Sequence, residues 1–164
     1  MSQIQKALDK IPVPVTLVGA YNEEGHNVIT VSWFTQVSQE PSLIMVSISP
    51  SSSIIPVISE TKEFVVSLLP QDNEQVARIC GHTRENVTDK IKEAKLTVKD
   101  GNKLNVPLIE QAIVNFECKV TNQYTAGDHN VIIANVVSAD KIKEEKPMVF
   151  YDRDLVAIDN SQST

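Results

Sequence analysis

Apolar residues along this chain fall mostly into short runs that have the length of β-strands. Residues 43–48 form one such run between Pro41 and Pro50, and prolines often bound strands because they lack the N–H that a sheet needs. Turn-forming sequences at residues 22–25 and 126–128 separate β-rich segments, as in hairpins. The pattern predicts strands at residues 13–21, from residue 28 onward, and at 43–48, 63–69, 112–124, 129–139 and 148–157.

Helical spacing of apolar residues is limited to brief segments. A short amphipathic helix is predicted at residues 1–10, and further helices at residues 54–60, 72–79 and near 88–94, with Cys80 and Gly81 ending the third. Residues 82–108 are rich in charge and poor in apolar side chains, so we expect an excursion that covers a site. Six or more strands joined mainly by turns favour an antiparallel barrel over alternating βαβ units.

Composition limits the class of protein. A chain of 164 residues with 41% hydrophobic content is long enough for one domain, expected at residues 1–159 and followed by a disordered tail at 160–164. The net charge of −6 argues against nucleic acid as a partner, because phosphates repel an acidic surface. No apolar run approaches the roughly 20 residues of a membrane span. Cys80 and Cys118 form no metal or redox motif, so we expect a cytoplasmic protein without a metal site.

Residues 27–38 contain the only tryptophan of the chain, and they interleave polar and apolar side chains. Because their apolar positions do not alternate strictly, we expect a strand, a bend near Trp33 and a second extended piece. Bent strands with polar rims commonly line ligand sites, so these residues are a candidate binding wall. In the alternative interpretation, Trp33 fills the barrel core and the hydroxyl groups satisfy strand edges.

Familiar catalytic motifs are missing from the sequence. No G-x-G-x-x-G follows a strand, and neither G-x-x-x-x-G-K-[ST] nor G-x-S-x-G nor H-E-x-x-H occurs. The sequence therefore gives no support for a Rossmann cofactor site, a P-loop, a nucleophile elbow or a zinc protease site.

Several blocks together resemble the flavin reductase-like family, a group of FMN-binding split barrels that includes flavoredoxins. The blocks are residues 14–18, residues 27–38 with the pattern Asn-x-x-Thr-x-Ser-Trp-Phe-Thr-x-Val-Ser, and residues 41–48. They continue with Cys80-Gly81 followed by Asp89-Lys90, with residues 108–112 running into 116–120, and with Gly127-Asp128-His129 at a strand start. The resemblance extends through nearly the whole chain.

The resemblance implies a mainly β fold: a Greek-key split β-barrel of about six or seven antiparallel strands with a few short peripheral helices. It also implies a homodimer with one FMN per subunit near the dimer interface, and it implies His129 as the catalytic residue. The cofactor-binding residues that it implies are Asn27, Thr30, Val31, Ser32, Trp33, Ser47, Ser49, Ser51, Ser52, Ser53, Lys90 and His129.

Individual residues of this set have alternative interpretations. A histidine at the start of a strand, such as His129, is also common as a turn-stabilising side chain. Lys90 can pair with the FMN phosphate, or it can be one solvated charge among several. Many family members carry a cation and a threonine where this chain has Ser52 and Ile54, so residues 51–53 would hold a phosphate through hydroxyl and N–H groups alone, or would merely cap a helix.

Two hypotheses of function follow. In the first, FMN takes up hydride from NAD(P)H, or electrons from a redox partner protein, and passes them on, as in a flavin reductase or a flavoredoxin-type electron carrier. In the second, the chain is a non-catalytic split-barrel binding or interaction module in which flavin binding is weak or lost.

Overall fold

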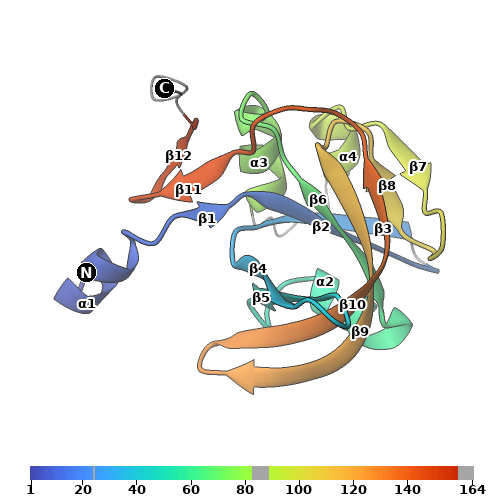
Figure 1. Cartoon of the computed structure of the whole chain (residues 1–164), viewed down its shortest axis with the longest axis horizontal. Coiled ribbons are helices and arrows are strands. Elements are labelled where there is room, and N and C mark those ends of the chain that lie inside the picture. Colours follow the sequence, from blue (N-terminus) through green and yellow to red (C-terminus); the bar gives the residue numbers. More distant parts are fainter. Residues whose placement is uncertain (24, 83–88, 159–164) are drawn as a thin grey trace.

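The computed structural model describes residues 1–23, 25–82 and 89–158 (Figure 1). Its helices are α1 (Gln3–Leu8), α2 (Ile54–Thr61), α3 (Glu74–Gly81) and α4 (Lys90–Glu93). Its strands are β1 (Val13–Pro14), β2 (Thr16–Asn22), β3 (Gly25–Val31), β4 (Phe34–Ser38), β5 (Leu43–Ile48), β6 (Glu63–Leu68), β7 (Val98–Asp100), β8 (Pro107–Ile109), β9 (Val114–Ala126), β10 (His129–Lys141), β11 (Val149–Tyr151) and β12 (Asp154–Val156).

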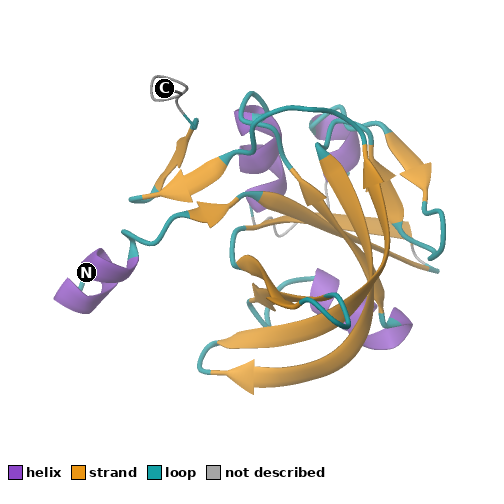
Figure 2. Ribbon diagram, viewed as in Figure 1, coloured by secondary structure: helices purple, strands orange, loops and turns teal. Residues whose placement is uncertain are grey.

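A seven-stranded antiparallel sheet dominates the structure, with the strand order β3-β2-β6-β9-β10-β5-β4. The sheet curls strongly, and the short helices lie around it (Figure 2). Its edge strands β3 and β4 follow each other directly in the sequence. The chain bends between them at Ser32 and Trp33 and so crosses from one edge of the sheet to the other. The predicted mainly β split barrel with a few short helices is therefore confirmed.

The larger apolar core fills the inside of the curled sheet. Strand β5 alternates buried and half-buried positions, and its buried residues Ile44, Val46 and Ile48 point into this core. Helix α2 adds Ile54, Ile55, Val57 and Ile58 to the same cluster, so it packs against the inner face of the sheet. Burial of this apolar face, rather than helix propensity, stabilises such a short helix.

A second core lies on the other face of β2 and β3. Leu17 and Val28 belong to it, together with Ala77 and Cys80 of α3 and with Met148 just before β11. Helix α4 and the β7–β8 hairpin lie on the same side of the barrel as α3 (Figure 1). The part of the sheet that contains β2 and β3 is thus covered on both faces by other segments of the chain.

Glu117 of β9 fixes the loop that precedes β8. Its carboxylate is buried and accepts hydrogen bonds from the backbone N–H groups of Asn102, Lys103 and Leu104 at 2.9, 2.8 and 2.7 Å. Burial raises the pKa of this carboxyl, but these bonds and one from Ser138 outweigh burial and hold the pKa below its usual range. Gly101 is required beside it, since a Cβ there would lie 2.3 Å from the Leu104 carbonyl oxygen.

One local prediction was wrong. Residues 148–157 form the hairpin β11–β12 and not one strand, because Asp152 and Arg153 adopt positive φ angles of 51° and 69° in a tight turn that the sequence does not signal with glycine. The excursion at residues 82–108 contains the expected short helix as α4, and it also contains β7, which pairs with β8. Helix α3 ends at Gly81, so its end falls at the predicted stop of Cys80 and Gly81.

The helices expected at residues 1–10, 54–60 and near 88–94 occur as α1, α2 and α4; α1 and α4 are shorter than expected and α2 is one residue longer. The bend near Trp33 is confirmed. The expected tail at residues 160–164 lies outside the described residues. No helix in the described part of the chain is long and apolar enough to cross a membrane.

Candidate functional site

Trp33 lies at the bend between the two edge strands, and 51% of its surface is exposed. The interpretation in which it fills the core is therefore wrong. Its carbonyl accepts a hydrogen bond of 3.0 Å from the Ser47 N–H, which fixes the bend on β5. Its ring centroid lies 4.5 Å from that of His129, with 48° between the ring planes. The bend thus brings two predicted site residues, far apart in the sequence, into contact.

The register of the sheet shows which face carries this ring pair. Ser47 pairs with Val131 and Met45 with Ile133, and these positions alternate with the inward residues Val46 and Ile132. Side chains alternate across a strand, so Ser47, Met45, Val131, Ile133 and the start of β10 at His129 point outward. We call the outer surface of β4, β5, β9 and β10 the uncovered face; its members include Trp33, Leu43, Met45, Ser47, Tyr124, His129 and Ile133. Val131 points the same way but is buried.

Asp128 holds the imidazole of His129 through the ring nitrogen Nδ1. Its Oδ1 lies 2.8 Å from Nδ1 of His129, and the two side chains are 96% and 25% exposed. The hydrogen bond to His129 lowers the pKa of the Asp128 carboxyl. His129 is therefore ordered between a carboxylate and an indole ring.

The serines of the predicted phosphate end lie where β5 leaves the sheet and α2 begins. The hydroxyls of Ser49 and Ser51 are 2.9 Å apart, and the Ser52 N–H donates to the Ser49 carbonyl at 3.0 Å. Asn27 of β3 donates from Nδ2 to the Ser53 hydroxyl at 2.7 Å. Ser53 precedes α2 but its side chain makes no capping hydrogen bond, so a helix cap does not account for it.

Other predicted residues lie apart from this group. The Thr30 hydroxyl donates to the Ala77 carbonyl of α3 at 2.7 Å, on the face of β3 opposite to Asn27. Val31 is buried in the larger core, and Ser32 accepts a backbone hydrogen bond from Phe34 inside the bend. Lys90 donates from Nζ to the Cys80 carbonyl at 3.0 Å, at the end of α3. The structure thus joins Trp33, Ser47 and His129, and it joins Asn27 with the serines.

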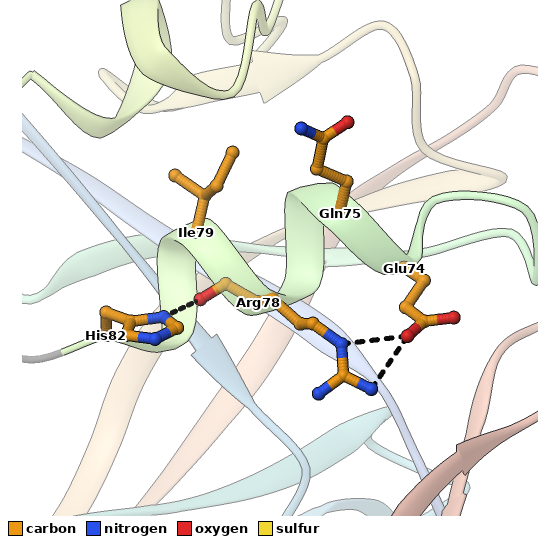
Figure 3. A pocket seen from close by; sticks show the side chains of 5 residues that line it. All are labelled: Glu74, Gln75, Arg78, Ile79 and His82. Atoms are coloured by element: carbon orange, nitrogen blue, oxygen red, sulfur yellow. Dashed lines mark hydrogen bonds and ion pairs between the residues drawn. The ribbon is translucent and has the colours of Figure 1, made fainter.

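A shallow hollow of about 380 Å³ lies over the outward side of α3 (Figure 3). Glu74, Gln75, Arg78, Ile79 and His82 line it, and none of them is a predicted site residue. Arg78 pairs with Glu74 at 2.7 Å, and His82 makes a hydrogen bond to the Arg78 carbonyl. Glu74, Arg78 and His82 are thus engaged within α3 itself, and the hollow contains no predicted site residue, so it does not replace the ring pair as the candidate site.

Comparison with known families decides the affiliation of the chain. The model of the flavin reductase like domain matches residues 8–159. The chain belongs to the flavin reductase-like family. Among relatives of this family, the actinorhodin polyketide dimerase of Streptomyces coelicolor is 30% identical over 161 residues, which cover 94% of this chain and 85% of the relative. The NADH:riboflavin 5′-phosphate oxidoreductase of Streptomyces pristinaespiralis is 29% identical, with 90% and 82% covered.

Solved structures of flavin reductase-like proteins share the fold. The NADH:FAD oxidoreductase of Streptomyces globisporus C-1027, solved in complex with NAD and FAD fragments, superposes with a TM-score of 0.87 at 22% identity. The superposition covers 98% of this chain and 94% of the other. The family resemblance read from the sequence blocks is therefore confirmed.

Sequence reasoning missed the contribution of Asp128 and of the uncovered face. The sequence indicates Asp128 only as part of a turn and of the Gly127-Asp128-His129 block, with no role for its carboxylate beside the imidazole. Leu43, Met45 and Ile133 were expected only as parts of strands. The register that places them all outward depends on pairing between segments that are distant in sequence.

Proposed function

We propose that this protein is a flavoprotein that binds FMN and carries hydride from NADH to a second acceptor. The observation that supports this most directly is the contact of the exposed Trp33 with the partly buried His129, whose ring centroids are 4.5 Å apart on the uncovered face. Ser47 of β5 and Ser49, just beyond the end of β5, follow along the chain from this pair, and two extended residues span about 6.6 Å. A planar ring at Trp33 with a polar chain running toward the serines matches the shape of FMN.

The groups around Trp33 and the serines suit FMN. Trp33 offers an apolar ring surface, and the Ser49, Ser51 and Ser53 hydroxyls, with N–H groups at the start of α2, offer hydrogen bonds to a ribityl chain and a phosphate. Ile54, by contrast, is fully buried in the larger core and faces away from any phosphate. The phosphate would thus be held by neutral groups of residues 49–53, and we propose Lys90 as a more distant cationic contribution.

Bound FMN would supply the hydride chemistry, because its ring accepts a hydride from a nicotinamide and passes electrons on. The side chains of this protein bind and orient. Trp33 supports one ring, His129 offers a hydrogen bond to the reacting partners, and the bend fixed by Ser47 keeps both in place. The relatives include an NADH-dependent FAD reductase and an NADH:riboflavin 5′-phosphate oxidoreductase, both from Streptomyces; we propose FMN because the serine group would meet a terminal phosphate.

Titration with FMN tests the proposal. Trp33 is the only tryptophan, so stoichiometric quenching of its fluorescence, followed by bleaching of the visible flavin band on addition of NADH, is the expected result. The absence of any response at high FMN concentration would refute it. That outcome supports the second candidate, a non-catalytic split-barrel module, which is favoured by the neutral serine run at the phosphate end. Quenching without bleaching by NADH or NADPH indicates a protein electron donor instead.

A homodimer is the second part of the proposal. Leu43, Met45 and Ile133 of the uncovered face belong to none of the apolar clusters among the described residues, and Trp33 and Tyr124 are 51% and 54% exposed. A contiguous apolar surface of this kind is typical of an interface. Sedimentation should show a dimer that Met45→Asp converts into a folded monomer. A wild-type monomer with FMN bound would refute the dimer.

The cellular setting is also proposed. Cys80 and Cys118 are both buried as free thiols, which fits a reducing compartment such as the cytoplasm. We propose that residues 1–159 act as one domain, since α3 and the strands near residue 150 share one core with β2 and β3.

A further inference from the structure

Residues 1–14 form an arm that leaves the barrel at one end of the molecule. Helix α1 lies at that end of the longest axis, and the turn between β9 and β10 points toward the same end (Figure 1). The arm is attached at its base, because Val13 of β1 pairs with Phe150 of β11. Beyond this pairing, α1 extends away from both apolar cores, and none of its residues belongs to either.

A latch on the turn between β11 and β12 sets the direction of α1. The N–H of Asp152 donates a hydrogen bond of 2.8 Å to the carbonyl of Asp9, directly after the helix. The ammonium of Lys10 lies 2.5 Å from the carboxylate of Asp152, and it lies 5.6 Å from the ring centroid of Tyr151. The arm is therefore tied down at its inner end, in contrast to the frayed terminus that is common in small domains.

One side of the arm is apolar and exposed. Within the described chain, no residue of α1 is buried, and Ile4, Leu8 and Ile11 are 74%, 51% and 56% exposed. Their spacing of four and three residues places them on one side of a helix, and we call these three residues the apolar ridge. A helix of six residues is not stable by itself in water, and such helices normally depend on the packing of an apolar face. The ridge thus has the pattern of a contact surface.

The same chain offers a surface that fits the ridge. Leu43, Met45 and Ile133 of the uncovered face belong to none of the apolar clusters among the described residues. In a two-fold dimer, a contact of one protomer's arm with its partner's face is matched by the reverse contact, so both apolar surfaces are buried at once. A lipid surface fits less well, because the net charge of −6 is repelled by anionic lipids and Lys10 is already paired with Asp152.

We infer that α1 is an intersubunit clamp, whose apolar ridge packs on the uncovered face of a second copy of this chain. The inference rests on the proposed homodimer, and it adds the arm as a contact that reaches beyond the sheet. The ridge is exposed in the single chain because its partner surface belongs to the other protomer. The latch at Asp152 holds the ridge in the direction that this contact requires.

Sedimentation equilibrium of the FMN-loaded protein tests the clamp. The variant Ile4→Asp/Leu8→Asp should weaken the dimer roughly a hundredfold or more, because each of two arms loses two apolar contacts and each such contact is worth about tenfold. Its circular dichroism spectrum should otherwise match that of the wild type, since neither side chain is buried within its own chain. Lys6→Asp is the matched control: it lies roughly opposite the ridge on α1, changes the net charge by the same amount, and should leave dimerisation unchanged.

Mixed dimers show where the arm lies. A spin label is attached at Lys6→Cys, since the native thiols of Cys80 and Cys118 are buried, and this protein is mixed with isotopically labelled wild type. The methyl resonances of Met45 and Ile133 in the labelled chain should broaden. A dimer in which they stay sharp, or in which Ile4→Asp/Leu8→Asp dimerises like the wild type, overturns the clamp and leaves the homodimer standing.

A wild-type protein that is monomeric at every concentration overturns the clamp and the homodimer together. Binding of that monomer to phosphatidylglycerol vesicles, lost in Ile4→Asp/Leu8→Asp, would then assign the ridge to a lipid surface. Neither result bears on the flavin chemistry, which the FMN titration decides separately.

Discussion

Replacement of Glu117 by Gln changes one atom in a site where the carboxylate holds three backbone N–H groups. Oε2 accepts from Lys103 and Leu104, and Oε1 accepts from Asn102. The oxygen of a glutamine can keep the hydrogen bonds of one carboxylate oxygen. The NH₂ group would then stand where the other oxygen was, facing a backbone N–H donor. The variant therefore loses at least one charge-assisted bond and leaves a buried donor without an acceptor, at a cost of about 2–4 kcal/mol. For a protein of this size, that corresponds to a fall in melting temperature of about 4–16 °C.

Urea unfolding followed by far-ultraviolet circular dichroism measures this loss, with Glu60→Gln as a control at an exposed position of α2. The pH dependence adds a second check. Because the folded state lowers the pKa of Glu117, its stabilisation is fully present above the unfolded pKa of about 4.3 and is lost as the pH falls through the folded value. The gap between wild type and Glu117→Gln should thus shrink in acid. Equal stability at neutral pH, or a gap that widens in acid, would contradict the role given to this carboxylate.

The burial and hydrogen bonds of three other sites lead to further expected results. Trp33→Ala should weaken FMN binding about threefold to tenfold, measured by the fluorescence of the flavin, and should barely change stability because the side chain is half exposed. Asn115→Ala should lower the free energy of unfolding by about 3–5 kcal/mol, since this buried amide bonds both the N–H and the carbonyl of Ile109 as well as Ser67; an unfolding curve like that of the wild type would contradict this. Burial raises the pKa of Cys80 to about 11, so neither thiol should react with a disulfide reagent at neutral pH until urea unfolds the chain.

The sequence allowed the strands and the family to be predicted, because both depend on local patterns. The apolar run in residues 43–48 and the turn sequences at 22–25 and 126–128 are short-range signals, and the structure contains the corresponding strands and turns. The turn at Asp152 and Arg153 was missed because residues with positive φ there are not the usual asparagine or glycine.

The sequence could not show that the predicted site residues fall into separate groups, because this depends on the three-dimensional structure. Asn27 and Thr30 are close in sequence, yet one bonds Ser53 and the other bonds the carbonyl of Ala77 on the opposite face of β3. The faces of a strand follow from alternation, but which face meets α2 and which meets α3 depends on long-range packing. The contact of Trp33 with His129 likewise depends on how the sheet curls.

The junction at Ser32 and Trp33 links the two edges of the sheet through the covalent chain instead of through a hydrogen-bonded ladder. Opening it requires the loss of few bonds, such as the one from Ser47 to the Trp33 carbonyl, while the paired strands elsewhere stay intact. We therefore expect local fluctuations of the barrel to be concentrated at this junction, beside the ring pair of Trp33 and His129. Amide hydrogen exchange should be fastest in the sheet at this junction, and a bound ring that spans it would slow exchange there before it raised the stability of the whole molecule.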